Sequence, residues 1–364
     1  MKRFDKNANG LAAGLTTEHF GTCPLPISDH DTVQLGHGSG GSMSQDLISK
    51  LFVWAFDNSI LSELEDSAVL QLGDTRIAFS TDSFVVDPIF FPGGDIGDLA
   101  VNGTVNDLSM SGAKPLYLSL GIILEEGFPL VDLRRIVESI RKAADQANVT
   151  VVTGDTKVLN KGKGDKIFIN TTGIGILEND MRISSHQVEP GDAIIVNGGI
   201  AEHGMAVLSR REGLAFETSI ISDTAPLNGL VESVLDAGGD HIHAMRDPTR
   251  GGVAATLNEL SSASNVGIQL IEERIPISAP VSGACEFLGI DPLNVANEGK
   301  VIVAVGIQKA KAVLAAMRAH PYGRDAVIIG KASTENRGMV TMQTAIGGWR
   351  IVDMMVGEQL PRIC

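Results

Sequence analysis

Residues 149–157 read Val-Thr-Val-Val-Thr-Gly-Asp-Thr-Lys, which predicts a short apolar strand followed by an acidic turn that contains glycine. Residues 130–147 come just before it, and their apolar side chains recur at the spacing of an amphipathic helix. Residues 115–124 are almost continuously apolar and predict a buried strand ahead of that helix. A strand, a helix and a second strand in succession indicate a fold that mixes helices with sheets.

The rest of the chain continues this pattern over 364 residues, a length that suits two domains of ordinary size. Further strands are predicted at 68–72, 76–80, 166–176, 193–197, 241–246, 267–271, 301–305 and 326–332. Further helices are predicted at 44–56, 96–112, 203–211, 227–237, 252–262, 281–288 and 310–320. We therefore expect an α/β (α+β) protein with an N-terminal extension, two domains and a flexible tail, at 1–33, 34–185, 186–346 and 347–364.

Net charge, apolar runs and cysteine content exclude several classes of protein. A net charge of −15 argues against nonspecific nucleic-acid binding, although acidic residues can still hold a nucleotide through Mg²⁺. No stretch reaches the ~18 apolar residues of a membrane span, and the N-terminus lacks the apolar core of a secretory signal. Three widely spaced cysteines are neither a disulfide framework nor a zinc motif. We expect a protein of the reducing cytoplasm that binds neither nucleic acid nor membrane.

A glycine-rich loop, Gly36-His37-Gly38-Ser39-Gly40-Gly41, precedes the helix predicted at 44–56. Such a loop can present backbone N–H groups to an anion. It is neither a phosphate-binding loop of the GK[ST] type nor a dinucleotide fingerprint, since the required ending and the leading strand are missing. A flexible turn, with His37 as an ordinary loop residue, explains the same pattern.

Four carboxylates recur near the ends of predicted elements in the first half, namely Asp66, Asp82, Asp107 and Asp155. Any one of them could be a solvated cap or turn residue. Mg²⁺ binds hard oxygen ligands and commonly shares them with substrate phosphates. Together with the glycine-rich loop, the four carboxylates predict a magnesium–nucleotide site.

Three further residues have plausible chemical roles. Lys157 follows the acidic turn and could neutralise a transferred phosphoryl group, or be a surface charge. Arg250 lies in Asp247-Pro248-Thr249-Arg250-Gly251-Gly252 at a predicted helix start, an arrangement that favours anions. Glu298 lies in a polar break and could be a general base if burial raises its pKa, or a turn carboxylate.

The chain ends on a cysteine, Cys364. It could be an incidental terminal residue, a lipidation site or a covalent carrier. A prenylation box needs the cysteine fourth from the end, which excludes that motif here. A carrier would need an exposed and mobile thiol whose thiolate can attack an electrophile.

These motifs, taken in order, resemble the HypE family of hydrogenase maturation factors, also called carbamoyl dehydratases. The family belongs to the ATP-binding superfamily of aminoimidazole ribonucleotide synthetase and selenophosphate synthetase. The resemblance covers about residues 34–364. It is carried by the glycine-rich loop and by Ser80-Thr81-Asp82-Ser83, Phe91-Pro92-Gly93-Gly94, Asn106-Asp107, Thr153-Gly154-Asp155-Thr156-Lys157-Val158, Arg246–Gly252, Asn297-Glu298-Gly299-Lys300 and Pro361-Arg362-Ile363-Cys364.

The resemblance implies a two-domain PurM-like fold that forms a homodimer through the sheets of the N-terminal domains, with ATP and Mg²⁺ as cofactors. It implies that the partner HypF places a carbamoyl group on Cys364. The chain would then use ATP to dehydrate this S-carboxamide to a thiocyanate. The cyanide would pass to iron held by the HypC–HypD complex, for a nickel–iron hydrogenase.

The resemblance also implies roles for individual residues. Asp66, Asp82 and Asp107 would hold Mg²⁺, Lys157 would steady the phosphoryl group, Glu298 would be the base, and Cys364 would carry the substrate. Contacts to ATP are implied for Gly38, Ser39, Gly40, Gly41, Asp82, Asn106, Gly154, Asp155, Thr156 and Arg250. We expect Cys364 to enter the nucleotide cleft of its own subunit, close to Lys157 and Glu298. Two alternatives are a superfamily kinase or synthetase that acts on a free small molecule, and a carrier without catalysis.

Overall fold

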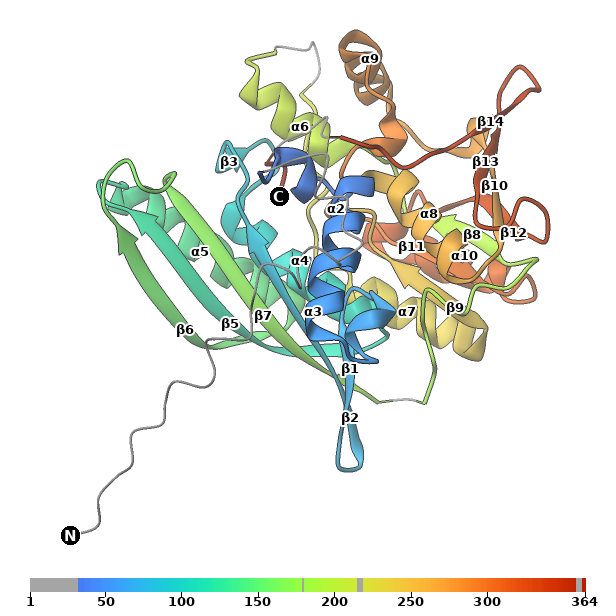
Figure 1. The fold of residues 1–364 in the computed structure, drawn as a ribbon, viewed down its shortest axis with the longest axis horizontal. Coiled ribbons are helices and arrows are strands. Elements are labelled where there is room, and N and C mark those ends of the chain that lie inside the picture. The colour runs from blue at the N-terminus through green and yellow to red at the C-terminus, as the bar shows by residue number, and fades with distance from the viewer. Residues whose placement is uncertain (1–31, 179, 215–218, 358–361) are drawn as a thin grey trace, which may run out of the picture.

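The computed structural model describes residues 32–178, 180–214, 219–357 and 362–364. It contains two large sheets, one from each half of the chain, with helices packed beside them (Figure 1). The mixed fold class predicted from the sequence is therefore confirmed. The predicted N-terminal extension, 1–33, lies outside the described residues except for its last two.

The first half forms a five-stranded sheet in the order β1-β2-β7-β5-β6. Its strands are β1 (Ala68–Leu72), β2 (Thr75–Phe84), β5 (Lys114–Glu125), β6 (Thr150–Leu159) and β7 (Ile167–Leu177). The other elements of this half are η2 (Leu35–Gly38), α2 (Ser42–Leu47), η3 (Ile48–Val53), α3 (Trp54–Phe56), η4 (Leu61–Glu63), the small hairpin of β3 (Phe90–Phe91) and β4 (Gly94–Asp95), α4 (Ile96–Met110) and α5 (Leu130–Ala147). All strand pairs of the large sheet are antiparallel except β5 with β6. Helices α4 and α5 lie against one face (Figure 1).

Side chains alternate between the two faces of this sheet, as the pleat of a strand requires. Along β7 the odd-numbered residues are buried on the side of the helices, whereas Asn170 and Ile174 are exposed on the other side. The strand register places Phe79 and Tyr117 next to Ile174. We call this second side the open face. It carries a partly exposed apolar group, with Phe79, Tyr117 and Ile174 at 40%, 49% and 39% exposure.

The second half forms a seven-stranded sheet in the order β14-β13-β10-β12-β8-β11-β9. Its strands are β8 (Ala193–Val196), β9 (Ile242–Arg246), β10 (Gly267–Ile271), β11 (Ile302–Val305), β12 (Val327–Ser333), β13 (Val340–Gln343) and β14 (Trp349–Ile351). Its helices are α6 (Glu202–Arg211), α7 (Asn228–Gly238), α8 (Gly252–Ala263), α9 (Ala279–Leu288) and α10 (Ala310–Ala319), with short 3-10 turns η5 (Gly239–His241), η6 (Glu272–Arg274), η7 (Pro292–Asn294) and η8 (Pro321–Gly323).

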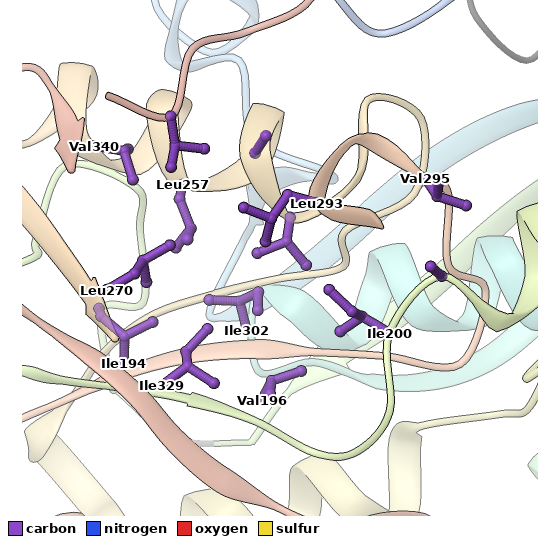
Figure 2. Packing of buried hydrophobic residues seen from close by; sticks show 14 of the residues in the cluster. Ile194, Val196, Ile200, Leu257, Leu270, Leu293, Val295, Ile302, Ile329 and Val340 are labelled. Carbon is purple, nitrogen blue, oxygen red and sulfur yellow. The ribbon is translucent and has the colours of Figure 1, made fainter. Parts of the chain in front are cut away.

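The central strands of this sheet are buried on both faces, which explains why β8 and β11 are apolar at every position. One core joins alternate strand residues to α6, α8 and α9, and Ile194, Ile302 and Leu257 meet in it (Figure 2). A second core joins the intervening strand residues to α7 and α10. Burying both faces provides a rigid base for the loops that leave the sheet toward the first half.

Helix α4 connects the two halves. Asp95 caps its N-terminus by accepting from the backbone N–H of Gly97 at 2.8 Å. Further along the helix, Asn102 donates to the Thr224 hydroxyl at 3.0 Å, and Asn106 donates to the carbonyls of Ala225 and Glu298 at 3.1 and 3.2 Å. Both asparagine side chains are buried, so their hydrogen bonds between the two halves are protected from water.

The structure differs from the predicted elements in several places. Strand β2 runs on to Phe84, so Asp82 lies within a strand and not after it. Strand β6 runs on to Leu159, so Gly154-Asp155-Thr156-Lys157 lies within a strand and not in a turn. Strands β13 and β14 follow α10, and β14 lies beyond residue 347, so the ordered sheet reaches into the predicted tail. The helix predicted at 44–56 is present, but it includes a π-helical segment, η3, and its apolar Phe52 is 45% exposed.

Among the described residues, no helix combines the length and the apolar character that crossing a bilayer requires.

Candidate active site

A cavity of about 80 Å³ lies where the glycine-rich loop, the end of β2, the loop before α8 and the last residues of the chain meet. Its walls include Gly38, Ser39, Ser83, Arg250 and Cys364. These residues come from positions as far apart as 38 and 364, so only the folded chain assembles the cavity. The structure thus brings together the predicted glycine-rich loop, the predicted arginine and the terminal cysteine.

The glycine-rich loop packs directly against the loop that carries Arg250. Gly40 has a φ of +78°, and a Cβ atom on it would lie 2.5 Å from the carbonyl oxygen of Arg250. Only glycine fits this close approach in a left-handed backbone conformation. The Arg250 guanidinium donates to the Gly38 carbonyl at 3.4 Å. His37 bonds locally to Gln34, as a loop residue would.

Carboxylates gather beside the cavity on the side of the sheet that faces α4. Asp107 of α4 accepts from the Ser80 hydroxyl at 2.8 Å. Burial, and next the neighbouring Asp247, Asp82 and Asp66, raise the pKa of Asp107 well above its usual range. Burial also raises the pKa of Asp82, against the nearby charge of Arg250. Mutual repulsion of this kind is relieved when a cation or a protonated group enters.

The donor set fits Mg²⁺ in part. Asp82 and Asp107 offer hard oxygen atoms in a crowded acidic environment, which is the chemistry that Mg²⁺ prefers. Asp66 is less available, because one of its oxygens pairs with the Arg246 guanidinium at 2.8 Å. Its other oxygen, Oδ2, is buried and has no hydrogen-bond partner among the described residues. The carboxylate oxygens of Asp66, Asp82 and Asp107 do not all lie within 4.8 Å of one another. In the described part of the chain, the one group of possible metal ligands that is this close consists of Glu63, Glu65 and His186.

Glu298 is a buried carboxyl at the edge of the same acidic group, with 3% of its surface exposed. Within the described chain its Oε1 atom has no hydrogen-bond partner. Burial, followed by the charges of Asp247 and Asp82, raises its pKa well above the usual range, while Arg250 opposes the shift. Its backbone is held firmly, since its N–H donates to Asp223 at 3.2 Å. A buried carboxyl with a raised pKa and an unpaired oxygen is suited to proton transfer.

Cys364 lies in the cavity close to Arg250, Glu298 and Asp82. Burial raises the pKa of its thiol to about 12, and Arg250 acts in the opposite direction. A thiol in this position is protonated at neutral pH and is therefore a weak nucleophile. The structure places the sulfur where a bound group could be acted on, not where the free thiol would attack a partner.

The residues of β6 lie elsewhere. Asp155 and Lys157 form an exposed ion pair of 2.6 Å, each with 67% of its side chain exposed. The register of β6 with β5 and of β5 with β7 places both on the open face, whereas Asp82 alternates onto the face of α4. Strand β6 is also three strands from β2, about 14 Å across the sheet at ~4.8 Å per strand. Within one chain, the structure does not bring Lys157, Asp155, Gly154 or Thr156 to Cys364.

Asn106 was predicted to contact ATP, but its side chain is used within the protein. Its amide donates to two carbonyls, and its Oδ1 accepts from the backbone N–H of Leu227 at 2.8 Å. With 1% of its surface exposed, it holds the Glu298 segment against α4. It therefore acts on the site through Glu298.

The residue roles reasoned from the sequence did not include Asp247, His203 or Arg211. Asp247 joins the acidic group, and burial raises its pKa to about 6. It could have been found, since it lies three residues before Arg250 in the same motif. His203 and Arg211 contact the tail, and no local pattern marks them.

Comparison with known proteins identifies the family of this chain. The models of AIR synthase related proteins match here, the N-terminal domain at 64–177 and the C-terminal domain at 189–343. Carbamoyl dehydratase HypE of Rhizobium leguminosarum bv. viciae is 52% identical over 91% of this chain and 95% of its own length. Carbamoyl dehydratase HypE of Escherichia coli (strain K12) is 46% identical over 92% of this chain and 100% of its own length.

Solved structures give the same result. A crystal structure of a HypE–HypF complex matches with a TM-score of 0.81 and 51% identity, covering 85% of this chain and 99% of that one. A crystal structure of the hydrogenase maturation protein HypE in complex with ATP matches with a TM-score of 0.77 and 50% identity, covering 92% and 100%. This chain therefore belongs to the HypE family of carbamoyl dehydratases, and its two halves are the two domains of AIR synthase related proteins.

Proposed function

We propose that this protein is an ATP-dependent carbamoyl dehydratase that acts on its own C-terminal cysteine. It would convert an S-carboxamide on Cys364 to a thiocyanate, which supplies the cyanide ligand for the iron of a nickel–iron hydrogenase. The observation that carries the proposal is the position of Cys364 inside the cavity of the glycine-rich loop, beside Arg250 and Glu298. The names of the relatives and the ATP complex of one of them support it.

The reaction must turn an amide oxygen into a leaving group. The carboxamide oxygen attacks the γ-phosphorus of ATP, and the bond from that phosphorus to the ADP oxygen breaks. The carbon–oxygen bond then breaks, inorganic phosphate leaves, and the nitrogen loses both of its protons as the carbon–nitrogen triple bond forms. The net change is S-carboxamide plus ATP to thiocyanate, ADP and phosphate.

The residues of the site suit these steps. Glu298, with its raised pKa and unpaired oxygen, is placed to accept an N–H proton. Arg250 and the backbone N–H groups of Gly38 to Gly41 can face the phosphate charge. Asp82 and Asp107 would hold Mg²⁺, which would neutralise phosphate charge when bound.

The open face of the first sheet supports the proposal of a homodimer. An exposed apolar group on a sheet is costly in water and is normally covered by another surface. Pairing with the open face of a second copy would cover Phe79, Tyr117 and Ile174. It would also place Asp155 and Lys157 at the junction between subunits, which is where we propose that Lys157 steadies the phosphoryl group.

The tail must also leave the cavity. A thiol with a pKa of about 12 is not nucleophilic while it is docked, so carbamoylation requires Cys364 outside. We propose HypF as the donor of the carbamoyl group and the HypC–HypD complex as the acceptor of the cyanide, in the cytoplasm. The crystal structure of a HypE–HypF complex supports the first of these partners.

Mass spectrometry of the C-terminal peptide tests the function. The chain is incubated with HypF, carbamoyl phosphate and MgATP. We expect a carbamoyl adduct on Cys364 that then loses one molecule of water. An adduct that persists without loss of water contradicts the proposal. Deleting Cys364 distinguishes the alternative, because a kinase or synthetase acting on a free small molecule would keep its turnover.

A further inference from the structure

The docked tail is held by its buried Ile363 side chain, by the ion pair of Arg362 with Asp165, and by hydrogen bonds to a backbone oxygen of each of residues 362–364. The N–H of Val85 donates to a terminal carboxylate oxygen of Cys364 at 3.0 Å, and the N–H of Asp87 donates to the carbonyl of Arg362 at 3.2 Å. The Arg362 side chain returns a bond to the Val85 carbonyl at 2.9 Å. The last three residues thus pair with the chain that follows β2, in the manner of a short added strand.

His203 binds the remaining carbonyl of the tail. It is fully buried on α6, and its Nε2 atom lies 2.9 Å from the Ile363 carbonyl oxygen. A carbonyl can only accept, so Nε2 carries the hydrogen, and Nδ1 accepts from the Ser222 hydroxyl at 2.8 Å. Burial lowers the pKa of His203, which keeps this neutral tautomer. The edge-on ring of Phe91 packs against the imidazole, with ring centroids 5.3 Å apart.

Arg211, at the end of the same helix, joins the tail to the segment after β2 with which the tail pairs. Its Nε donates to the Asp87 carbonyl and its Nη2 to the Arg362 carbonyl, each at 2.7 Å. A guanidinium can make both bonds at once because its donors are fixed in one plane. Bonds from a charged donor to two carbonyls are among the stronger hydrogen bonds in proteins.

His203 is also connected to Glu298, the proposed general base, through one loop. Ser222, its hydrogen-bond donor, precedes Asp223, which accepts from the backbone N–H groups of Glu298 and Gly299 at 3.2 Å each. Asp223 further pairs with Lys300 at 2.9 Å. One short loop therefore holds both the tail contact and the segment that carries Glu298.

We propose that His203 and Arg211 are positioning residues that recognise the backbone of the C-terminal tail and set the sulfur of Cys364 against Glu298. This inference rests on the proposed function. Because these contacts are made to the backbone, they do not depend on the group bound to the sulfur. The same contacts can therefore hold the tail whether Cys364 is a free thiol, a carboxamide or a thiocyanate. The two side chains set how far the sulfur reaches into the cavity, and they bind backbone carbonyls that no step of the reaction alters.

Alkylation of the full-length chain by iodoacetamide, followed by mass spectrometry of its cysteine-containing peptides, tests the contacts of His203 and Arg211 with the tail without ATP or HypF. Arg211→Met and His203→Phe remove the donors, and the phenyl ring preserves the packing on Phe91. We expect both variants to raise the alkylation rate of Cys364 about tenfold or more, as loss of a buried hydrogen bond predicts. His203→Gln, which keeps a donor, should restore part of the protection.

Two controls exclude a general loosening of the fold. Arg210→Met makes the same chemical change at an exposed position one residue earlier and should leave the rate unchanged. Cys285 is buried on α9, and its alkylation should stay slow in every variant. Wild-type alkylation rates at Cys364 in both Arg211→Met and His203→Phe would overturn the inference.

Dehydration provides the second readout. Starting from the carbamoylated chain, Arg211→Met should lower the single-turnover rate of water loss, while carbamoylation by HypF stays unchanged. A slower carbamoylation with normal water loss would overturn the inference. If the wild-type adduct itself never loses water, the proposed function fails. The alkylation result still decides whether His203 and Arg211 hold the tail.

Discussion

Glu298 is the residue whose role the structure sharpens most. From the sequence it was either a base or a turn carboxylate, and in the structure it is a buried carboxyl with an unpaired oxygen. We expect Glu298→Gln to keep ATP binding and to slow single-turnover dehydration by roughly 10²–10⁴-fold, because it removes a general base and little volume. Mass spectrometry of the C-terminal peptide measures the rate.

Glu273→Gln, at an exposed position of η6, is the matched control for that change and should keep the wild-type rate. An unchanged rate in Glu298→Gln would remove the assignment of Glu298 as the base.

Asp98 gives a prediction about pH. Burial raises its pKa from 3.8 to about 7, although the Asp95 N–H bond opposes the shift. The folded state therefore binds more protons than the unfolded state between pH 4 and 7, and the free energy of unfolding falls as pH rises through that range. Asp98→Asn removes the penalty. We expect it to stabilise the protein by about 1–4 kcal/mol at pH 8, and not at pH 4.

Chemical denaturation at several pH values measures this effect. Asp145→Asn, on the exposed side of α5, is the control and should change stability by less than ~0.5 kcal/mol. A stabilisation in Asp98→Asn that is equal at pH 4 and pH 8 would contradict the expected linkage.

At the scale of elements, the first sheet separates two residues, Asp82 and Lys157, that the family resemblance assigns to one site. Alternation and register place Lys157 on the open face and Asp82 on the face of α4. The sequence predicted both as site residues, but it could not assign faces, because β6 was predicted to end before Gly154. Because Gly154 to Lys157 continue the strand, their side chains alternate between the two faces of the sheet, and the register decides which face each one takes.

The open face also yields a test of the homodimer. Ile174→Lys places a charge at the centre of the apolar group between Phe79 and Tyr117. We expect it to weaken dimerisation at least tenfold, since a buried unpaired charge is costly. Sedimentation equilibrium measures the dissociation constant. Val158→Lys, on the opposite side of the same sheet at 66% exposure, should leave it unchanged. A dimer of wild-type strength in Ile174→Lys would exclude this face as the interface.

At the scale of the whole molecule, an ion pair network fastens the two halves together. Arg246 at the end of β9 pairs with Asp66 at 2.8 Å and with Glu259 at 3.1 Å, and its side chain is 13% exposed. We expect Arg246→Met to destabilise the fold by about 3–5 kcal/mol, because it leaves two carboxylates without their partner. Thermal or denaturant unfolding measures the loss.

The exposed pair of Arg350 with Asp291 is the control for that network. Its side chains are 40% and 31% exposed, so Arg350→Met should cost less than ~1 kcal/mol. Equal losses in the two variants would show that the Arg246 network has no special part in joining the halves.

Local patterns in the sequence were enough to predict the order of most helices and strands, the division into two halves and the motifs of the family. These depend on neighbours within a few residues, which periodicity and turn residues record. The folded chain was needed to show that Asn106 holds Glu298, that Lys157 lies across the sheet from Asp82, and that His203 and Arg211 bind the tail backbone. The position of Lys157 depends on strand register, and the other contacts join residues more than a hundred positions apart, so a local pattern carries no record of them.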